Sequence, residues 1–299
     1  MRLSAERAAV RVPATTANMG PGFDSFGMAF RYYDEVEVRP VVGATHVDVK
    51  GVGAGMVPTD DTNLVVRALR VGLEVADAPQ AGFEMRCVNR IPHSAGMGSS
   101  ASAALAGLLL ARGLISEPQA LDDDTVFALA TDFEGHPDNV APALYGGATV
   151  AWVDAEGAPH AAPMPVDSHL PVSLLVPPDT TRLSTEEARM VLPDLVPRAD
   201  ALFNTSRAAV LMLALASRPD LLMAGTEDRL HQEYRRGVLP ASMAVVDSLR
   251  SQGYPAVVSG AGPTVLVLAT LSDQVCFSLE RSGWLVLSPS IDMTGAVLV

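Results

Sequence analysis

The spacing of apolar residues predicts the elements of the first half of the chain. Stretches that alternate between apolar and polar residues predict strands at 8–12, 35–39, 45–50, 82–89 and 148–153. Apolar residues three and four apart predict helices over 64–76, 99–112 and 124–133. The stretch 13–27 holds three glycines and two prolines, so we expect a constrained loop there.

The second half has a different order of elements. Strands are expected at 172–176, 256–258, 264–269 and 284–287, and helices at 186–191, 200–216, 241–251 and 272–281. Ser184 or Thr185 is expected to cap the first of these helices. Residues 156–169, rich in Pro, Ala and Gly, are predicted to form a long loop between domains. The last elements fit a ferredoxin-like sandwich, so we predict an α+β chain of two domains, 1–165 and 166–299, that share one cleft.

Composition narrows the class of protein. Hydrophobic residues make up 48% of the chain and charged residues 18%, as in a well-cored globular enzyme. The net charge of −13 argues against a nucleic-acid partner. No apolar run predicts a membrane span, and the first ten residues lack a signal-peptide core. Cys87 and Cys276 lie far apart, so we expect free thiols in a reducing cytoplasm.

Lys50 is the only lysine in the chain, and its position excludes two kinds of site. No GxxxxGK[ST] motif surrounds it, which excludes a P-loop nucleotide site, and a lysine-anchored pyridoxal site is excluded as well. Any ATP bound by this chain must therefore be held by backbone amides, hydroxyl groups and arginines.

The turn Gly96-Met97-Gly98-Ser99-Ser100 is the main candidate for holding phosphate. Its glycines let the backbone approach a ligand closely, and the helix predicted to start here would present free N–H groups to an anion. A tight turn before a close-packed helix explains the same residues equally well.

Three further segments carry candidate chemistry. Asn18 and Asp24, within 13–27, have groups that bind a cationic or hydroxylated substrate, or that stabilise a turn. Glu134 offers a magnesium ligand and His136 a proton acceptor, although an ordinary turn histidine is the simpler interpretation. The glycine turn 259–264 lies between two predicted strands and can approach the same ligand.

The order of these segments resembles that of the GHMP kinases. The chain carries PATTANMGPGFD from Pro13, GMGSSASAA from Gly96, EGHPDN from Glu134 and SGAGPT from Ser259. The resemblance extends from about residue 10 to residue 270, and within the superfamily it is to the homoserine kinase family. It implies an N-terminal α/β nucleotide-binding domain followed by a C-terminal ferredoxin-like α+β domain.

The resemblance also implies how ATP and Mg²⁺ are bound. Ser100, or Ser99, would hold Mg²⁺ together with Glu134, for which Asp132 is a rival. Ser94-Ala95 stands where the superfamily usually has a glycine and a basic residue. The residues implied for ATP, with adenine near the first, are Asn63, Pro92, His93, Ser94, Ala95, Gly96, Met97, Gly98, Ser99, Ser100, Ala101, Ser102, Gly260 and Gly262.

A third implication concerns the substrate, L-homoserine, which carries a carboxylate, an ammonium group and a hydroxyl. The family pattern places its carboxylate at Arg189, one helical turn after Thr185, and at Arg235. A planar guanidinium suits a carboxylate because it can donate two parallel hydrogen bonds. Asn18 and Asp24 would bind the ammonium group and the neighbouring polar atoms. Surface ion pairs with nearby glutamates are the alternative role of the two arginines.

The implied reaction converts L-homoserine and ATP to O-phospho-L-homoserine and ADP, a step of threonine biosynthesis. Asp138 occupies the position of the superfamily's base, and it either takes the hydroxyl proton or orients the substrate together with His136 and Asn139. Two alternatives remain, a GHMP kinase for a mevalonate-like or sugar substrate and a catalytically silent nucleotide-binding regulator. The resemblance allows a homodimer and implies no nucleic-acid or membrane partner.

Overall fold

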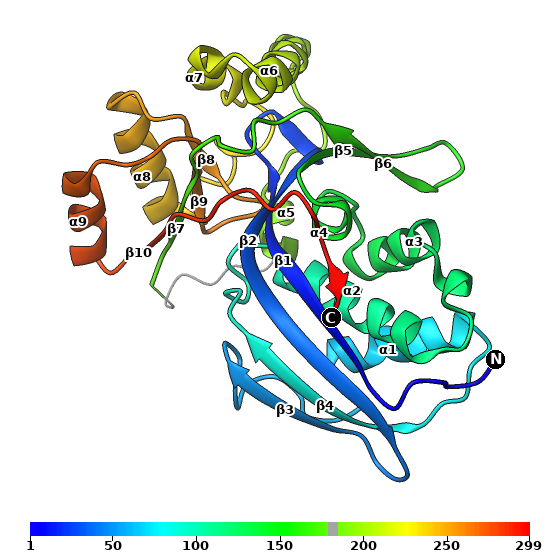
Figure 1. The fold of residues 1–299 in the computed structure, drawn as a ribbon. Helices are drawn as coiled ribbons and strands as arrows, with labels where there is room; N and C mark the ends of the chain where they lie inside the picture. Colours follow the sequence, from blue (N-terminus) through cyan, green and yellow to red (C-terminus); the bar gives the residue numbers. More distant parts are fainter. Residues whose placement is uncertain (179–184) are drawn as a thin grey trace.

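The computed structural model describes residues 1–178 and 185–299, except for the side chain of Thr185. Within these residues the chain forms two β-sheets (Figure 1). The first has the order β11-β1-β2-β4-β3, with β5 paired to β2 and β6 to β5. Its strands are β1 (Ala8–Asn18), β2 (Gly22–Val41), β3 (His46–Gly51), β4 (Gly82–Asn89), β5 (Ala148–Val153), β6 (Pro159–Met164) and β11 (Val297–Leu298). The second has the order β10-β7-β9-β8 and consists of β7 (Ser173–Val176), β8 (Ala256–Val258), β9 (Val265–Val267) and β10 (Leu285–Leu287).

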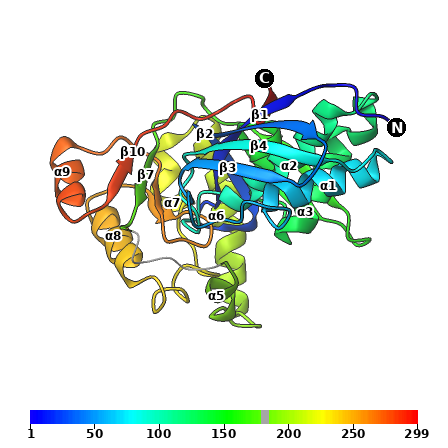
Figure 2. The same cartoon turned by 90° about the horizontal axis from the view of Figure 1, so that it is seen from below.

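Helices of the N-terminal half pack beside the first sheet (Figure 2). They are α1 (Leu64–Val75), α2 (Ser99–Leu114), α3 (Asp123–Glu134) and α4 (Val140–Tyr145), with a short 3₁₀ helix at Pro118–Leu121. α2 and α4 pack against β1 and β2, and α1 and α3 pack against α2. A Cβ on Gly107 of α2 would lie 2.3 Å from the carbonyl oxygen of Val65, so only glycine permits this approach of α1. Gly107 therefore serves the close packing of α2 against α1.

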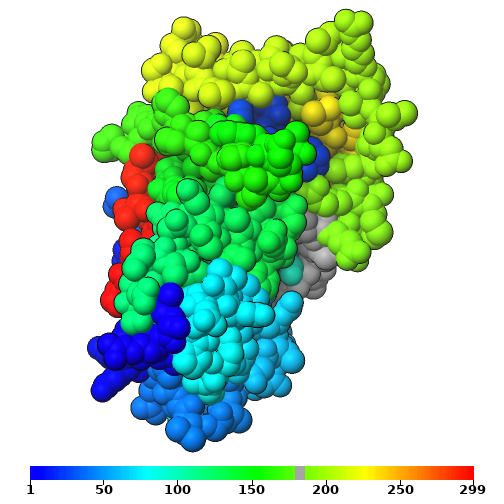
Figure 3. All heavy atoms as spheres, turned by 90° about the vertical axis from the view of Figure 1, so that its right-hand side faces the viewer, coloured from blue at the N-terminus to red at the C-terminus, as the bar shows by residue number. Residues whose placement is uncertain are grey.

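The C-terminal half contributes the remaining helices. They are α5 (Thr185–Met190), α6 (Arg198–Ala216), α7 (Leu222–Gly225), α8 (Pro240–Ser251) and α9 (Asp273–Arg281), with a 3₁₀ helix at Pro219–Leu221. The yellow-green residues of α6 lie above the green residues of β5 and β6 in both Figure 1 and the side view of Figure 3. Three residues of α6 are buried in the core that also contains the C-terminal end of β1 and the N-terminal half of β2: Leu211, Ala214 and Leu215.

The second sheet confirms the ferredoxin-like prediction. Neighbouring strands in the order β10-β7-β9-β8 are all antiparallel, α8 precedes β8, and α9 precedes β10. The chain then returns to the first sheet, where Val297 and Leu298 of β11 pair with β1. The division of the chain at residue 165 stays a prediction.

The loop predicted for 13–27 is wrong, because β1 continues to Asn18 and β2 starts at Gly22. Thr15 pairs with Ala29 and Thr16 with Met28, with irregularities in register before and after them. Residues 12–18 are buried without alternation, so a strand covered on both faces shows no period of two. Without that alternation, the glycines and prolines of residues 13–27 favoured the prediction of a loop, although most of these residues lie in β1 and β2.

The loop predicted for 156–169 is also wrong in part, because β6 pairs antiparallel with β5. Pro159 and Pro163 lie in this strand. β6 is an edge strand with a single partner, where proline is tolerated because no second ladder needs its missing N–H. The six-residue helix α4 and the two-residue strand β11 were not predicted, because neither is long enough to show a period.

Within the described part of the chain, α6 has the length and apolarity of a membrane-spanning helix. The same helix carries Arg198, Asp200 and Arg207. A single helix of this composition also occurs in ordinary globular domains, so it is weak support for a membrane span.

Asp34 of β2 binds the backbone at Arg90 and Ile91, a few residues before the turn at Gly96–Gly98. Its Oδ1 accepts hydrogen bonds from the backbone N–H groups of Arg90 at 2.6 Å and Ile91 at 2.9 Å. Burial raises the pKa of Asp34 to about 6, and the two N–H groups and the Arg90 charge oppose that rise.

The variant Asp34→Asn is expected to reveal this buried charge in the pH dependence of stability. The folded pKa of about 6 lies above the ordinary value of 3.8, so ionised Asp34 lowers the free energy of unfolding and its protonation restores it. Between pH 7.5 and pH 5 the natural chain should gain about 1 kcal/mol in the free energy of unfolding relative to Asp34→Asn. Urea unfolding of both chains at the two pH values measures this, and a constant or reversed difference would contradict it.

Candidate active site

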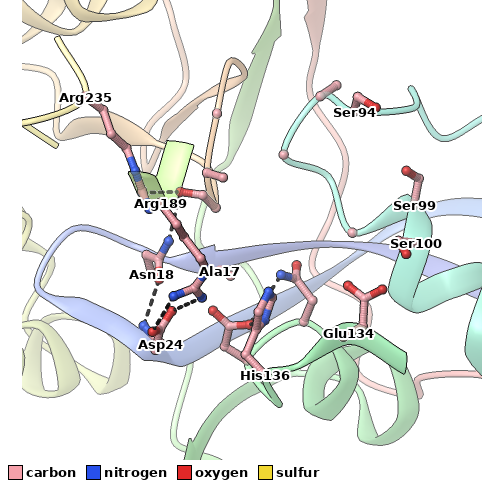
Figure 4. A pocket seen from close by; sticks show the side chains of 18 residues that line it. Ala17, Asn18, Asp24, Ser94, Ser99, Ser100, Glu134, His136, Arg189 and Arg235 are labelled. Carbon is pink, nitrogen blue, oxygen red and sulfur yellow. Dashed lines mark hydrogen bonds and ion pairs between the residues drawn. The ribbon is translucent and has the colours of Figure 1, made fainter. Parts of the chain in front are cut away.

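One cavity of about 200 Å³ lies where β1, β2, the start of α2 and the C-terminal half meet (Figure 4). It collects the segments that the sequence singled out. Its lining consists of Ala17, Asn18, Asp24, Ser94, Ala95, Gly96, Gly98, Ser99, Ser100, Glu134, His136, Asp138, Asn139, Arg189, Arg235, Gly260, Ala261 and Gly262.

The turn at 96–98 leaves the start of α2 open to the cavity. Gly96 and Gly98 have φ of +76° and +70°, and Gly98 precedes α2 without a side-chain cap. The Thr15 N–H donates to the Met97 carbonyl at 3.1 Å, and the Ser259 hydroxyl donates to the Gly96 carbonyl at 2.6 Å. The turn is therefore fixed from two sides, while the first N–H groups of α2 remain available to an anion.

We expect Gly98→Ala to weaken ATP binding at least tenfold. A Cβ at Gly98 would lie 2.0 Å from the Thr15 hydroxyl oxygen, so the turn would have to move away from β1. Gly157→Ala is the matched control, because Gly157 has φ of +88° but open space around its Cβ position. Calorimetric titration with ATP should separate the two variants, and equal affinity of Gly98→Ala and the natural chain would contradict the assignment of the turn.

Ser100 and Glu134 lie together at this end of the cavity (Figure 4). Burial raises the pKa of Glu134, and a hydrogen bond from Ser100 opposes that rise. One carboxylate and one hydroxyl fit Mg²⁺, which usually takes one or two protein carboxylates and completes its shell with water and phosphate oxygens. Asp132 is exposed and does not line the cavity. Among the described residues, no cluster of three or more His, Cys, Asp or Glu side chains could hold a metal by itself.

His136, Asp138 and Asn139 form a hydrogen-bonded group on the cavity floor. His136 Nδ1 lies 2.5 Å from Asp138 Oδ1, and Asn139 Nδ2 donates to the same oxygen at 3.4 Å. The Thr15 hydroxyl donates to Asn139 Oδ1 at 2.8 Å. Burial lowers the pKa of His136, but the hydrogen bond and charge of Asp138 outweigh burial and leave that pKa above its ordinary value. Asp138 itself is 2% exposed.

Asn18, Asp24 and Arg189 lie at the other end of the cavity (Figure 4). Arg189 donates to both oxygens of Asp24, at 3.0 and 2.6 Å, and this pairing raises the pKa of Arg189. Asn18 accepts the Asp24 N–H at 2.9 Å and donates to the Gly260 carbonyl at 2.8 Å. Asn18 and Asp24 have φ of +68° and +55°, a conformation that Asn and Asp adopt more readily than most residues.

Arg235 is only 1% exposed, yet its guanidinium reaches the same end of the cavity (Figure 4). Its Nε donates to the Ala188 carbonyl at 3.0 Å, and one terminal nitrogen lies 3.3 Å from the Gly260 carbonyl. Burial and the neighbouring charge of Arg189 lower the pKa of Arg235 to about 10. Two arginines therefore share this end of the cavity, and only Arg189 is paired with a carboxylate, that of Asp24. The guanidinium of Arg235 donates to carbonyl groups and to His231, which leaves its charge available to an added anion.

A second cavity of about 490 Å³ adjoins the first through Ser94 and Ala95. Pro92 and His93 line it. Its other lining residues are largely apolar or glycine: Gly51, Val52, Gly53, Ala54, Met56, Val176, Pro177, Pro178, Pro263, Gly283 and Leu285. Ser94 has φ of +53°, which glycine adopts at lower cost, as expected where the superfamily usually has glycine.

Four residues predicted for the site, Asn63, Met97, Ala101 and Ser102, line neither of the two cavities. Asn63 caps α1 by accepting the Val65 N–H at 3.0 Å, and it lines neither of the two cavities. Met97 and Ala101 are buried in the apolar cores, and Ser102 is buried behind the turn. Thr185 begins α5, but its side chain is outside the described residues. Ala17 and Ala261 line the cavity without having been predicted, and a small apolar residue gives no sequence signal for such a role.

Comparison with known proteins places these features in a family. A model of the GHMP kinases N terminal domain matches residues 63–147, and one of the GHMP kinases C terminal domain matches residues 211–279. A homoserine kinase of Clavibacter michiganensis is 47% identical over 300 residues, which cover 98% of this chain and 94% of the relative. A homoserine kinase of Streptomyces avermitilis is 47% identical over 290 residues, which cover 96% and 94%.

Solved structures share the fold. The crystal structure of homoserine kinase from Cytophaga hutchinsonii matches with a TM-score of 0.81 and 23% identity, covering 99% of this chain and 98% of the other. The mevalonate kinase of Methanococcus jannaschii matches with a TM-score of 0.69 and 12% identity, covering 95% and 98%. At these identities the likeness concerns the fold alone, and it confirms the two-part architecture predicted from the motifs.

Proposed function

The chain belongs to the homoserine kinase family of the GHMP kinases, and from this membership we propose that it transfers the γ-phosphoryl group of ATP to the hydroxyl of L-homoserine. The products are ADP and O-phospho-L-homoserine, an intermediate of threonine biosynthesis. The observation that carries the proposal is that one cavity joins an anion-binding turn to a paired Asp24 and Arg189.

ATP is proposed to lie across the two adjoining cavities. The apolar walls of the larger cavity suit adenine, and the shared residues Ser94 and Ala95 lead from it to the turn at Gly96–Gly98. The start of α2 then faces the phosphates with backbone N–H groups and the hydroxyls of Ser99 and Ser100. This arrangement needs no lysine, in agreement with the position of Lys50 in the exposed strand β3.

Ser100 and Glu134 are proposed to hold Mg²⁺ with the phosphate oxygens. Bound there, the ion supplies positive charge that offsets the charge developing on the transferred phosphoryl group. Glu134 must be ionised to serve as a ligand; burial raises its pKa by disfavouring the bare charge, and a cation bound beside the carboxylate would lower that pKa again.

The opposite end of the cavity suits a zwitterionic amino acid. Its carboxylate can replace Asp24 on Arg189 and also meet Arg235, while its ammonium group replaces Arg189 on Asp24. Every charge of the resting pair is then paired again. The carboxylate of mevalonate could also displace Asp24 from Arg189, but mevalonate has no ammonium group to pair with the displaced Asp24. A neutral sugar would leave the Asp24–Arg189 pair in place and would supply no anion to Arg235.

Asp138 is proposed to receive the hydroxyl proton during transfer. Both of its hydrogen bonds to described residues go to Oδ1, which leaves Oδ2 for the substrate hydroxyl. The substrate oxygen forms the new bond to the γ-phosphorus, the bond to the bridging oxygen of ADP breaks, and Asp138 accepts the proton. His136 and Asn139 hold the carboxylate in place.

Phosphorus NMR tests the function by identifying the product. With ATP, L-homoserine and Mg²⁺, the full chain should give a phosphomonoester that coincides with added O-phospho-L-homoserine, and the signal should stop growing when EDTA is added. ATP binding without any phosphorylated product would favour the catalytically silent regulator instead.

A further inference from the structure

His231 connects the two parts of the proposed amino-acid site, although it does not line the cavity. It is fully buried, with Nε2 2.7 Å from the Gly20 carbonyl and Nδ1 2.9 Å from a terminal nitrogen of Arg235. Its ring stacks on Phe23 at 5.0 Å between centroids and 19° between planes. Gly20 lies in the turn between β1 and β2, Asn18 ends β1, and Phe23 and Asp24 lie at the start of β2. One imidazole therefore touches both this 18–24 hairpin and Arg235.

The partners of His231 fix its protonation. An arginine can only donate a hydrogen bond, so Nδ1 must accept, and a backbone carbonyl can only accept, so Nε2 must carry the proton. A second proton on Nδ1 would remove the bond to Arg235 and place two cations in contact. Burial lowers the pKa of His231, and the charge of Asp228 opposes this decrease. The neutral ring is therefore the form that fits both partners.

Asp228 holds the backbone of His231 from behind. Its side chain is fully buried, and its oxygens accept the N–H groups of Leu230 at 2.9 Å, His231 at 3.1 Å and Gln232 at 2.8 Å. Asn204 of α6 donates to the same carboxylate at 3.0 Å. The imidazole is thus presented by a turn that is itself fully hydrogen-bonded.

We infer that His231 is a positioning residue. As a neutral imidazole it holds the Arg235 guanidinium and the 18–24 hairpin in the arrangement that receives the substrate carboxylate. Arg235 reaches the cavity from a buried position, and its other bonds go to the carbonyls of Ala188 and Gly260. Without the acceptor on His231, the guanidinium loses the one side chain among the described residues to which it donates a hydrogen bond, and this bond sets its tilt toward the 18–24 hairpin. The inference rests on the proposed function, because the carboxylate is that of L-homoserine.

Two conservative variants separate the two hydrogen bonds. Asparagine places an amide oxygen near the position of Nδ1 and can still accept from Arg235, whereas glutamine places an amide nitrogen near Nε2 and can still donate to Gly20. We expect His231→Gln to raise KM for L-homoserine about tenfold and His231→Asn about threefold, with KM for ATP unchanged and kcat within about twofold. Phe23→Leu removes the stacked ring together with its contacts to the guanidiniums of Arg189 and Arg235, at 5.7 and 5.5 Å from the ring centroid, and should also raise KM for L-homoserine.

Steady-state kinetics of the full-length variants measure these values. If His231 only stabilised the fold, its variants would have lower melting temperatures and KM would rise for ATP as well as for L-homoserine. Melting temperatures are therefore recorded beside the two KM values. The inference is overturned if His231→Gln leaves KM for L-homoserine unchanged, if Gln and Asn act alike, or if KM for ATP rises in parallel. Failure of the natural chain to phosphorylate L-homoserine would instead reject the proposed function, a distinct result.

Discussion

Replacing Asp138 with asparagine is expected to lower kcat at least a hundredfold. Asparagine has nearly the same shape and can still accept the hydrogen bond from His136, but it cannot take a proton from the substrate hydroxyl. A positioned general base contributes about 10² to 10⁴ in rate. Because binding of ATP and L-homoserine involves other groups, both KM values should change less than about threefold.

Asp132→Asn is the matched control, since Asp132 is an exposed carboxylate on α3 outside the cavity. Its kcat should equal that of the natural chain. A fall of less than about tenfold in Asp138→Asn would favour the alternative in which Asp138 only orients the substrate, together with His136 and Asn139.

Replacing Arg235 with methionine is expected to raise KM for L-homoserine about a hundredfold. Methionine keeps most of the buried volume but removes the guanidinium that is proposed to bind the carboxylate. Hydrogen bonds to a charged partner contribute about 1.5–3 kcal/mol, which corresponds to about 10- to 150-fold in affinity. KM for ATP should not change, because the turn at Gly96–Gly98 that is proposed to bind the phosphates lies at the opposite end of the cavity (Figure 4).

Arg236→Met tests whether the effect belongs to this position. Arg236 is the next residue, but it is half-exposed and pairs with Glu233 and Asp247 outside the cavity. It should leave KM for L-homoserine unchanged. If Arg235→Met and Arg236→Met raised KM for L-homoserine equally, the rise would come from the loss of a positive charge and not from the loss of a group that binds the carboxylate.

The sequence predicted those parts of the site that lie in the motifs shared with the GHMP kinases. One cavity contains residues from all of these motifs, as their order implied: Asp24, Gly96, Gly98, Ser99, Ser100, Glu134 and Arg189. These residues are glycines in tight turns or carry charged and hydroxyl side chains, and such residue types at fixed spacings are recognisable in a sequence. Their placement in one cavity is a finding, whereas their roles in binding and catalysis stay proposals.

Other features depend on contacts that spacing does not encode. The 13–27 segment forms strand ends because it is buried on both faces, and such burial removes the alternation that marks a strand. His231 gains its role only because Gly20, 211 residues away in the chain, reaches its Nε2. Asn63 was expected near adenine, but its side chain is used to cap α1.

The central claim is that the charged end of the cavity selects an amino acid bearing a terminal hydroxyl. A coupled ADP-release assay with L-homoserine, L-threonine, mevalonate and galactose, each at several concentrations, tests it most directly. We predict that kcat/KM for L-homoserine exceeds each of the others at least a hundredfold, about 2.7 kcal/mol in transition-state stabilisation. Comparable or greater kcat/KM for mevalonate or galactose, or no turnover with any of the four despite ATP binding, would contradict it.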